Sequence, residues 1–374
     1  MSSDEITIPT EILHDILHLL CDEPIALHDL KNKSHFHKFP WAVGQVCRHW
    51  RRAFLSYTHL WTSFTLKPGH FDAAYFVEMN RRAAIYLERS REQPLTIAVY
   101  TPCSYTEKFP KTVWRMLLSC LKRWEKANLV LWHGAARNEL LRCRGYMSSL
   151  KSLRMYIPRS TALKHNNAFE VAPHLTELDL DHRGYTATWQ FPWARLMKLK
   201  IETSTGFHHS YGNNLCGILF QLENIEELHI IEGLIIVTTS RHISPPSSLP
   251  ITCLRSLRLL EIAMPFAMMF SCFTAPVLEQ LHIHGGYNNV NTHGRQPYER
   301  ELKSLIQRSS CHLRRLVLER CTTTEMRKMM KKLASVEELS INYFGPHGSV
   351  QDVNHHHNLL HPKPVFLTSH HMPS

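Results

Sequence analysis

The chain has 374 residues, 44% of them hydrophobic and 20% charged, and 43 Lys and Arg against 32 Asp and Glu give a formal net charge of +11. That composition supports a sizeable hydrophobic core and excludes a disordered chain. No run approaches the roughly 18 apolar residues of a membrane span, the acidic N-terminus is unlike a secretory signal, and the ten cysteines include no C-x-x-C pair. We therefore expect a soluble, reduced protein of the cytoplasm or nucleus, without a membrane partner.

The first 62 residues contain two amphipathic patterns with a helical period. Pro9 suits the first position of a helix, and the apolar residues that follow it share one face: Ile12, Leu13, Ile16, Leu17 and Leu20. After a polar loop over 22–38, a second face has apolar residues at +3, +4, +7 and +11 from its first member: Val43, Val46, Cys47, Trp50 and Phe54. We expect a small helical domain over residues 6–62, which Leu60 and Trp61 close.

An irregular repeat follows, built on L-x-x-L-x-L, in which the last two apolar residues point the same way from a short strand. Its eight copies start 21 to 35 residues apart, close to the leucine-rich-repeat period of about 20–29 residues. The copies are Leu150/Leu153/Met155, Leu175/Leu178/Leu180, Leu196/Leu199/Ile201, Ile225/Leu228/Ile230, Leu254/Leu257/Leu259, Leu278/Leu281/Ile283, Leu313/Leu316/Leu318 and Val336/Leu339/Ile341. Apolar residues with helical spacing lie between strands, at 114–121 and 215–222, so helix–strand units are expected to stack.

The expected fold is therefore α/β. The helical domain leads through a connecting strand and helix over 63–94 into an irregular leucine-rich-repeat solenoid over 95–344. Parallel strands would form one face of the solenoid, and helices and loops the other. Residues 244–250 and 285–299 are rich in turn formers and predict loops. The segment 345–374 has neither a helical nor a strand period and is expected to be disordered.

Side chains alternate along a strand, so the residues between the leucines should line the opposite, concave face of the sheet. The residues expected to bind a target there are Arg154, Tyr156, Asp179, Asp181, Lys200, Glu202, His229, Arg258, His282, His284, Glu319 and Asn342. Their mixture of charges, histidines and aromatic rings is typical of a protein-binding surface. A long row of Lys and Arg is missing, so nucleic acid is not expected. The alternative for each single residue is a solvated strand position.

Other chemistry finds little support in the sequence. His229, His282 and His284 fall on neighbouring strands, but no carboxylate or thiol at ligand spacing completes a zinc set, so we expect no metal and no cofactor. Nucleophile-elbow, phosphate-loop and H-E-x-x-H motifs are missing, so the chain is not expected to be an enzyme. The basic run 327–332 is either a solvated helix face or a site for an acidic partner.

The stretches IPTEILHDILHLL and VCRHWRRAFLSYTHLW resemble the F-box motif. The continuation through YLERSREQPLTIAVY into irregular leucine-rich repeats is similar to the fungal F-box-like proteins, so the resemblance covers residues 6–344. It implies a substrate-recognition subunit of an SCF-type cullin-RING ubiquitin ligase. The F-box would bind a Skp-type adaptor, and through it a cullin, while the repeats would hold a target protein. The loop over 22–38 is longer than in a compact F-box.

The resemblance assigns adaptor binding to the apolar residues of the helical domain. They are Ile8, Pro9, Ile12, Leu13, Ile16, Leu17, Leu20, Val43, Val46, Cys47, Trp50, Leu60 and Trp61. A domain of this size cannot bury all of them within itself, which favours a partner. The alternative is a scaffold without a role in ubiquitylation, in which the same residues pack on the first repeats and the helices only cap the solenoid.

Overall fold

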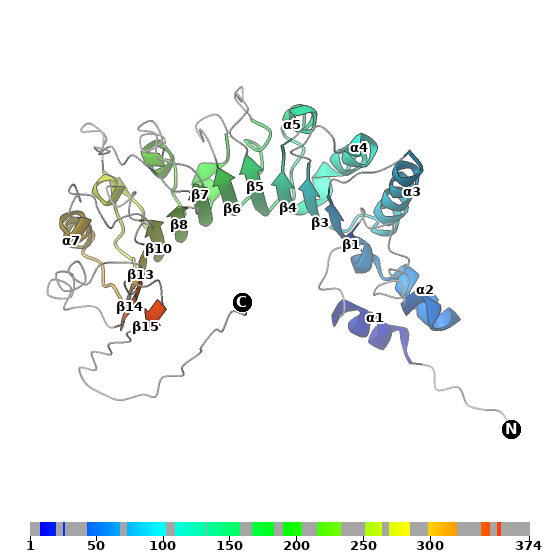
Figure 1. Cartoon of the computed structure of the whole chain (residues 1–374), viewed down its shortest axis with the longest axis horizontal. Helices are drawn as coiled ribbons and strands as arrows, with labels where there is room; N and C mark the ends of the chain where they lie inside the picture. The colour runs from blue at the N-terminus through cyan, green and yellow to red at the C-terminus, as the bar shows by residue number, and fades with distance from the viewer. Residues whose placement is uncertain are drawn as a thin grey trace.

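The computed structural model describes fourteen segments of the chain. They are residues 8–19, 25–26, 43–67, 73–101, 109–132, 134–157, 167–182, 190–203, 215–232, 251–263, 269–284, 298–319, 338–344 and 350–352. In these segments the protein is α/β, as expected, with one long curved sheet and helices along its outer side (Figure 1).

Thirteen strands form the main sheet, and each lies beside its neighbours in the sequence. All adjacent pairs are parallel except the last. The strands are β1 (Ile25–Ala26), β2 (Ser63–Leu66), β3 (Leu95–Tyr100), β4 (Trp124–Val130), β5 (Ser152–Ile157), β6 (Glu177–His182), β7 (Lys198–Thr203), β8 (Glu227–Glu232), β10 (Leu259–Ala263), β12 (Gln280–His284), β13 (Arg315–Glu319), β14 (Glu338–Phe344) and β15 (Val350–Asp352). A separate parallel pair is formed by β9 (Thr252–Cys253) and β11 (Phe273–Thr274).

The helices follow the convex side of the sheet, except at the N-terminal end, where α1 and α2 lie beyond its first strands (Figure 1). The α-helices are α1 (Thr10–Leu19), α2 (Arg48–Ser56), α3 (Ala73–Arg89), α4 (Lys111–Ser119), α5 (Gly134–Leu141) and α7 (Tyr298–Ser309). Short 3₁₀ turns are η2 (Val43–Gln45), η3 (Thr58–Trp61), η4 (Leu121–Arg123) and η6 (Trp193–Arg195). Residues 215–219 form a further helical turn before β8.

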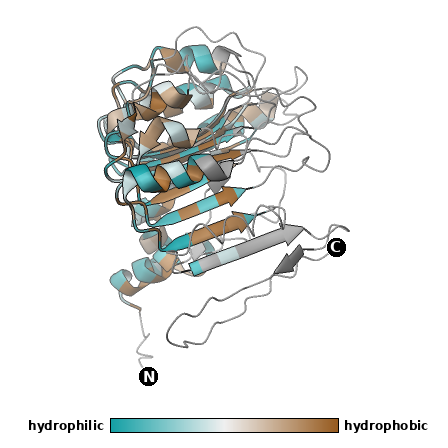
Figure 2. Ribbon diagram, turned by 90° about the vertical axis from the view of Figure 1, so that its left-hand side faces the viewer, coloured by the Kyte–Doolittle hydropathy of each residue, from teal (hydrophilic) through white to brown (hydrophobic). Residues whose placement is uncertain are grey.

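The core lies between the sheet and the convex layer. In six of the eight L-x-x-L-x-L copies all three apolar residues are buried, and they belong to one continuous core that reaches from Leu17 to Leu318. In five of these six copies the residue between the last two apolar positions is polar and at least partly exposed, and in the sixth it is the buried Val317, so hydropathy alternates along most of the strands (Figure 2). This alternation places the leucines toward the helices and leaves the polar residues on the concave side.

A backbone hydrogen-bond pattern recurs where the strands begin. The carbonyl of Lys151 accepts two N–H groups from the next strand entrance, those of Thr176 and Glu177, at 3.0 and 3.1 Å. The carbonyls of Thr176, Met197, Glu226, Arg258 and Glu279 each accept two N–H groups in the same way. These shared carbonyls fix the register of β5 to β13, so equivalent side chains form straight rows across the sheet.

The N-terminal helices join the first strands through aromatic packing. Trp61 is fully buried, with ring centroids 5.0 Å from Phe54 and 5.4 Å from Tyr86 of α3. The guanidinium of Arg89 lies 4.7 Å from the centre of the same indole. Leu17 of α1 belongs to this core as well. The helical unit is therefore packed against the sheet rather than tethered to it.

Three expectations about local structure need correction. The second amphipathic helix does not run unbroken from Val43, because Cys47 is extended and caps α2, its sulfur accepting from the N–H of Trp50 at 3.5 Å. The polar loop over 22–38 contains β1, which pairs with β2. The segment 345–374 contains β15, which pairs with the otherwise open edge of β14.

Several other predictions fall outside the described residues. They include the loop at 244–250, most of the loop at 285–299, the basic run 327–332 and the remainder of 345–374. The last two residues assigned to that second loop belong to α7, which begins at Tyr298.

Candidate functional site

The concave surface consists of the strand side chains that point away from the helices. From β5 to β13 it carries three parallel rows, one at the start of the strands, one in the middle and one toward their carboxyl ends. The middle row is Arg154, Asp179, Lys200, His229, Glu261, His282 and Val317. The carboxyl-end row includes Tyr156, Asp181, Glu202, Ile231, Ala263, His284 and Glu319.

Most of the predicted concave residues occupy these rows. On strands β5 to β8 they are Arg154, Tyr156, Asp179, Asp181, Lys200, Glu202 and His229, and on β12 and β13 they are His282, His284 and Glu319. Asn342 is the register partner of Glu319 on β14, although its side chain is outside the described part of the chain.

The prediction that Arg258 lies on the concave surface is wrong, because the side chains of β10 alternate in a different register from the one expected. In β10 the large buried residues are Leu260 and Ile262, so the residue that enters the middle row is Glu261, opposite His229 and His282. Arg258 lies before the strand, where its carbonyl accepts the N–H groups of Glu279 and Gln280. The segment offers two overlapping leucine triplets, and only the later one, Leu257/Leu260/Ile262, matches the neighbouring strands.

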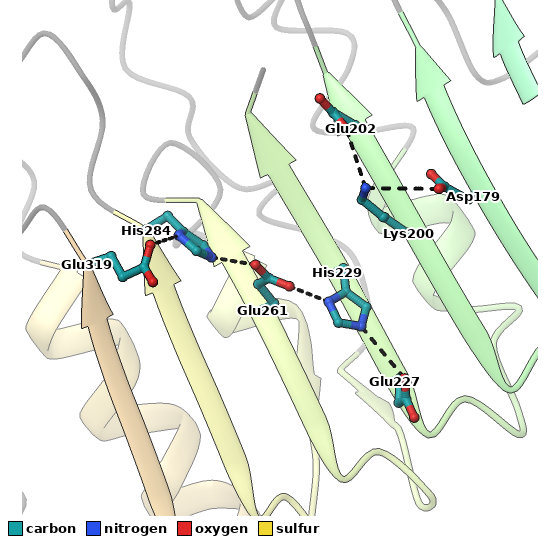
Figure 3. Close-up of polar contacts among 8 residues, drawn as sticks. All are labelled: Asp179, Lys200, Glu202, Glu227, His229, Glu261, His284 and Glu319. Atoms are coloured by element: carbon teal, nitrogen blue, oxygen red, sulfur yellow. Dashed lines mark hydrogen bonds and ion pairs between the residues drawn. The ribbon is translucent and has the colours of Figure 1, made fainter. Parts of the chain in front are cut away.

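The corrected register reveals a chain of alternating carboxylates and imidazoles across four strands, β8, β10, β12 and β13 (Figure 3). Glu261 is at its centre, with one oxygen bonded to Nδ1 of His229 and the other 2.6 Å from Nε2 of His284. His284 Nδ1 lies 2.8 Å from Glu319, and His229 Nε2 lies 3.9 Å from Glu227. Each ring nitrogen therefore faces a carboxylate.

The same contacts shift the ionisation of the central groups. Hydrogen bonds from His229 and His284 hold the pKa of Glu261 far below its usual range. The carboxylates of Glu261 and Glu319 raise the pKa of His284 to about 9, so this imidazole is protonated at neutral pH. Burial lowers the pKa of His282, which lies beside this chain and accordingly favours its neutral form.

A second polar group lies on the neighbouring strands β6 and β7. The ammonium of Lys200 is 3.4 Å from Glu202 and 4.0 Å from Asp179 (Figure 3). The guanidinium of Arg154, on the adjacent strand β5, lies 3.4 Å from the carboxylate of Asp179. Asp181 and Glu202 are register partners, so two like charges stand side by side at the carboxyl ends of the strands. Such a pair repels in isolation, which makes Lys200 important for this part of the surface.

Two of the three histidines considered above as zinc ligands, His229 and His284, contact carboxylates. Their partners are Glu227, Glu261 and Glu319, and the sequence patterns did not identify Glu227 or Glu261. In the described segments, no group of three or more His, Cys, Asp or Glu side chains is arranged to hold a metal ion. The signal that could have found Glu261 is the alternation of Leu260 and Ile262 around it.

The residues assigned to adaptor binding divide into two groups. Leu13, Leu17, Leu60 and Trp61 are at most 4% exposed and hold the unit together, so they are corrected to core residues. Ile12 is 49% and Val46 63% exposed, and Leu19 and Leu55, which were not predicted, are 75% and 40% exposed. Pro9 and Cys47 are also exposed, whereas Ile8, Ile16 and Trp50 are half-buried; the side chains of Leu20 and Val43 are outside the described residues.

The sequence matches no family model, and no curated protein matches it. Within the described segments, the helices are too short or too polar to cross a membrane.

Proposed function

We propose that this protein is a recognition subunit of an SCF-type ubiquitin ligase. Its N-terminal helical unit would dock on a Skp-type adaptor, an F-box role, and its curved sheet would act as an irregular leucine-rich-repeat surface that holds a target protein. Transfer of ubiquitin would be performed by other subunits, and this chain would contribute proximity.

The observation that carries the proposal is the distribution of apolar side chains on the helical unit. Four large aliphatic residues are exposed on α1, α2 and the turn between η2 and α2: Ile12, Leu19, Val46 and Leu55. Leu13, Leu17 and Trp61 of the same unit are buried, and Leu17 and Trp61 belong to the core that continues into the sheet. Apolar residues that the fold does not need, on a unit rich in helix, suit a helical partner.

The concave surface supports the second half of the proposal. It is wide, regular in register and lined by partly exposed charged, histidine and aromatic side chains. A stacked sheet of this kind offers an extended surface for another protein.

The proposal is tested by co-expression with a Skp-type adaptor and size-exclusion chromatography of the purified mixture. We expect a one-to-one complex that is lost when Ile12→Asp and Val46→Asp are combined, because a charge at the centre of an apolar contact costs at least roughly tenfold in affinity. Both positions are exposed, so the variant should retain its fold.

Matched controls come from exposed valines elsewhere in the chain. Val77 on α3 is 67% and Val171 is 48% exposed, and the Val77→Asp and Val171→Asp double variant should still bind the adaptor. Separate elution of the folded wild-type chain and the adaptor would sink the assignment. Equal losses in both double variants would also count against it, because the effect would not belong to the helical unit.

The scaffold alternative keeps one specific observation in its favour. Trp61 packs on both Phe54 and Tyr86, and Leu17 belongs to the same core as the repeats. These contacts support a capping role for the helical unit at the end of the sheet, whatever else it binds. Capping and docking use different residues, so the surface variants above, rather than a deletion, separate the two functions.

A further inference from the structure

The concave surface is acidic although the chain as a whole is basic. From β4 to β14 its three rows contain eight carboxylates: Glu177, Asp179, Asp181, Glu202, Glu227, Glu261, Glu319 and Glu338. They face five Lys and Arg residues: Lys126, Arg154, Lys198, Lys200 and Arg315. The sequence has a net charge of +11, so this excess of negative charge is local to the concave side.

The imbalance is strongest in the carboxyl-end row. Among its described side chains, Asp181, Glu202 and Glu319 are negative, His284 is positive by its contact with two carboxylates, and no Lys or Arg stands in the row. Asp181 and Glu202 are direct register neighbours, so a cation placed between them would relieve their repulsion.

One cation of the protein itself already lies against a residue of this row. Lys67 places its ammonium 5.7 Å from the ring centre of Tyr100, the β3 member of the row. Farther along, Tyr156 lies beside Asp181 and packs on Trp132, with 5.0 Å between ring centroids. Aromatic faces next to carboxylates are a favourable setting for Lys and Arg side chains.

We propose that the concave surface binds a lysine- or arginine-rich segment of the target protein, laid across strands β6 to β13 along the acidic carboxyl-end row. This inference deepens the proposed function, because it names the chemistry of the target. The carboxylates are held in place before binding: Glu261 by two imidazoles, Glu319 by His284 and Glu202 by Lys200. Fixed charges lose little side-chain entropy when a cation arrives.

The spacing of the strands gives the length of the segment. Strands β6 and β13 are five steps apart in the sheet, which at about 4.8 Å per step is about 24 Å, or about seven residues of an extended chain. Glu202 and Glu319 of the carboxyl-end row are on β7 and β13, and Glu261 of the middle row lies halfway between them on β10, two steps from each. Two steps are about 10 Å, close to three residues of an extended chain, so basic residues at every third position fit best.

The experiment measures peptide binding to the full chain by fluorescence anisotropy. The probe is a labelled peptide of four Lys-Gly-Ser repeats, and the comparison peptide has Glu in place of Lys. We expect the Lys peptide to bind, with an affinity that falls as NaCl is raised, and the Glu peptide not to bind. Net charge alone predicts the reverse order, because the whole chain is positive.

Variants locate the binding on the carboxyl-end row. Asp181→Asn with Glu202→Gln should weaken binding of the Lys peptide about tenfold, and Glu319→Gln at the far end of the row about threefold. The control is Glu92→Gln with Glu223→Gln, which makes the same charge change at exposed residues outside the concave rows and should alter the affinity less than about twofold.

Three results would each overturn the inference. They are equal binding of the two peptides, no binding of the Lys peptide, and equal losses of affinity in the test and control variants. Adaptor binding is measured on the same samples. A chain that binds the adaptor but not the Lys peptide keeps the proposed function and loses this inference. If the chain binds the Lys peptide at the carboxyl-end row but does not bind the adaptor, the basic-segment inference stands and the ubiquitin-ligase assignment is wrong.

Discussion

His284 is the residue whose environment departs most from that of an ordinary surface histidine. Its side chain is 24% exposed and lies between the carboxylates of Glu261 and Glu319, which raise its pKa to about 9. Because the folded-state pKa lies above the ordinary value of about 6.5, the stabilising contribution is complete below about pH 6.5 and is lost as the pH rises through about 9.

We expect this contribution to be on the order of 2 kcal/mol. Urea unfolding of the wild-type chain should show a decreasing midpoint between about pH 6.5 and 9, and the His284→Gln variant should show a flatter profile over the same range. His174→Gln, at an exposed turn, is the control and should leave the profile unchanged. A wild-type profile parallel to that of His284→Gln would contradict the proposed ion pairs.

At low pH the stability depends on pH in the opposite direction, because the fold lowers the pKa of Glu261. Its contribution is present above the ordinary value of 4.5 and is lost as the pH falls below it. The chain of imidazoles and carboxylates on the concave surface is therefore most stabilising between about pH 4.5 and 6.5.

At the scale of the element, β10 shows how one residue of register decides which side chains enter the core. Leu260 is fully buried, whereas its neighbour Leu259 points to the concave side and is partly exposed. Leu260→Ala should lower the free energy of unfolding by about 2–5 kcal/mol, and Leu259→Ala by less than about 1 kcal/mol. Denaturant unfolding of both variants measures the two losses of stability. A larger loss for Leu259→Ala than for Leu260→Ala would instead support the register that the sequence alone predicts.

The repeat pattern predicts the strands well because burial of an alternating pair is a local property of the sequence. It predicts neither β1 nor β15, because two or three residues carry no period, and their pairing depends on an open edge supplied by a distant segment. The contact between Glu261 and His284 joins residues on adjacent strands. It depends on the register set by shared backbone carbonyls, which hydropathy does not record.

The sequence predicts which residues form the helical unit but not which of them are buried and which are exposed. Amphipathic spacing marks Leu13 and Ile12 alike, yet Leu13 is 1% and Ile12 49% exposed. Which apolar residue faces the core depends on the crossing of α1 and α2, where the ring of His14 stacks on Tyr57 at 4.8 Å. Such packing is decided by tertiary structure, so a sequence pattern alone cannot separate core from docking residues.

At the scale of the whole molecule, the core is continuous from the helical unit through the sheet. A chain that begins at residue 63 would uncover Phe64 and Tyr86, which are 1% and 3% exposed in the intact protein. We expect this truncated chain to aggregate or to melt well below the full chain, as measured by light scattering and circular dichroism. A soluble truncated chain with the melting temperature of the full protein would show that the helical unit does not cap the sheet.

The order of strands in the sheet follows the order of residues in the chain. During synthesis each strand would emerge from the ribosome when its upstream neighbour in the sheet is already in place, so it could pair at once and the growing edge alone would wait for the next strand. The N-terminal unit would fold first and offer β2 as a template, and growth would proceed one strand at a time. A polypeptide of this length could thus reach its native state by vectorial folding, with a short unpaired edge exposed at any moment.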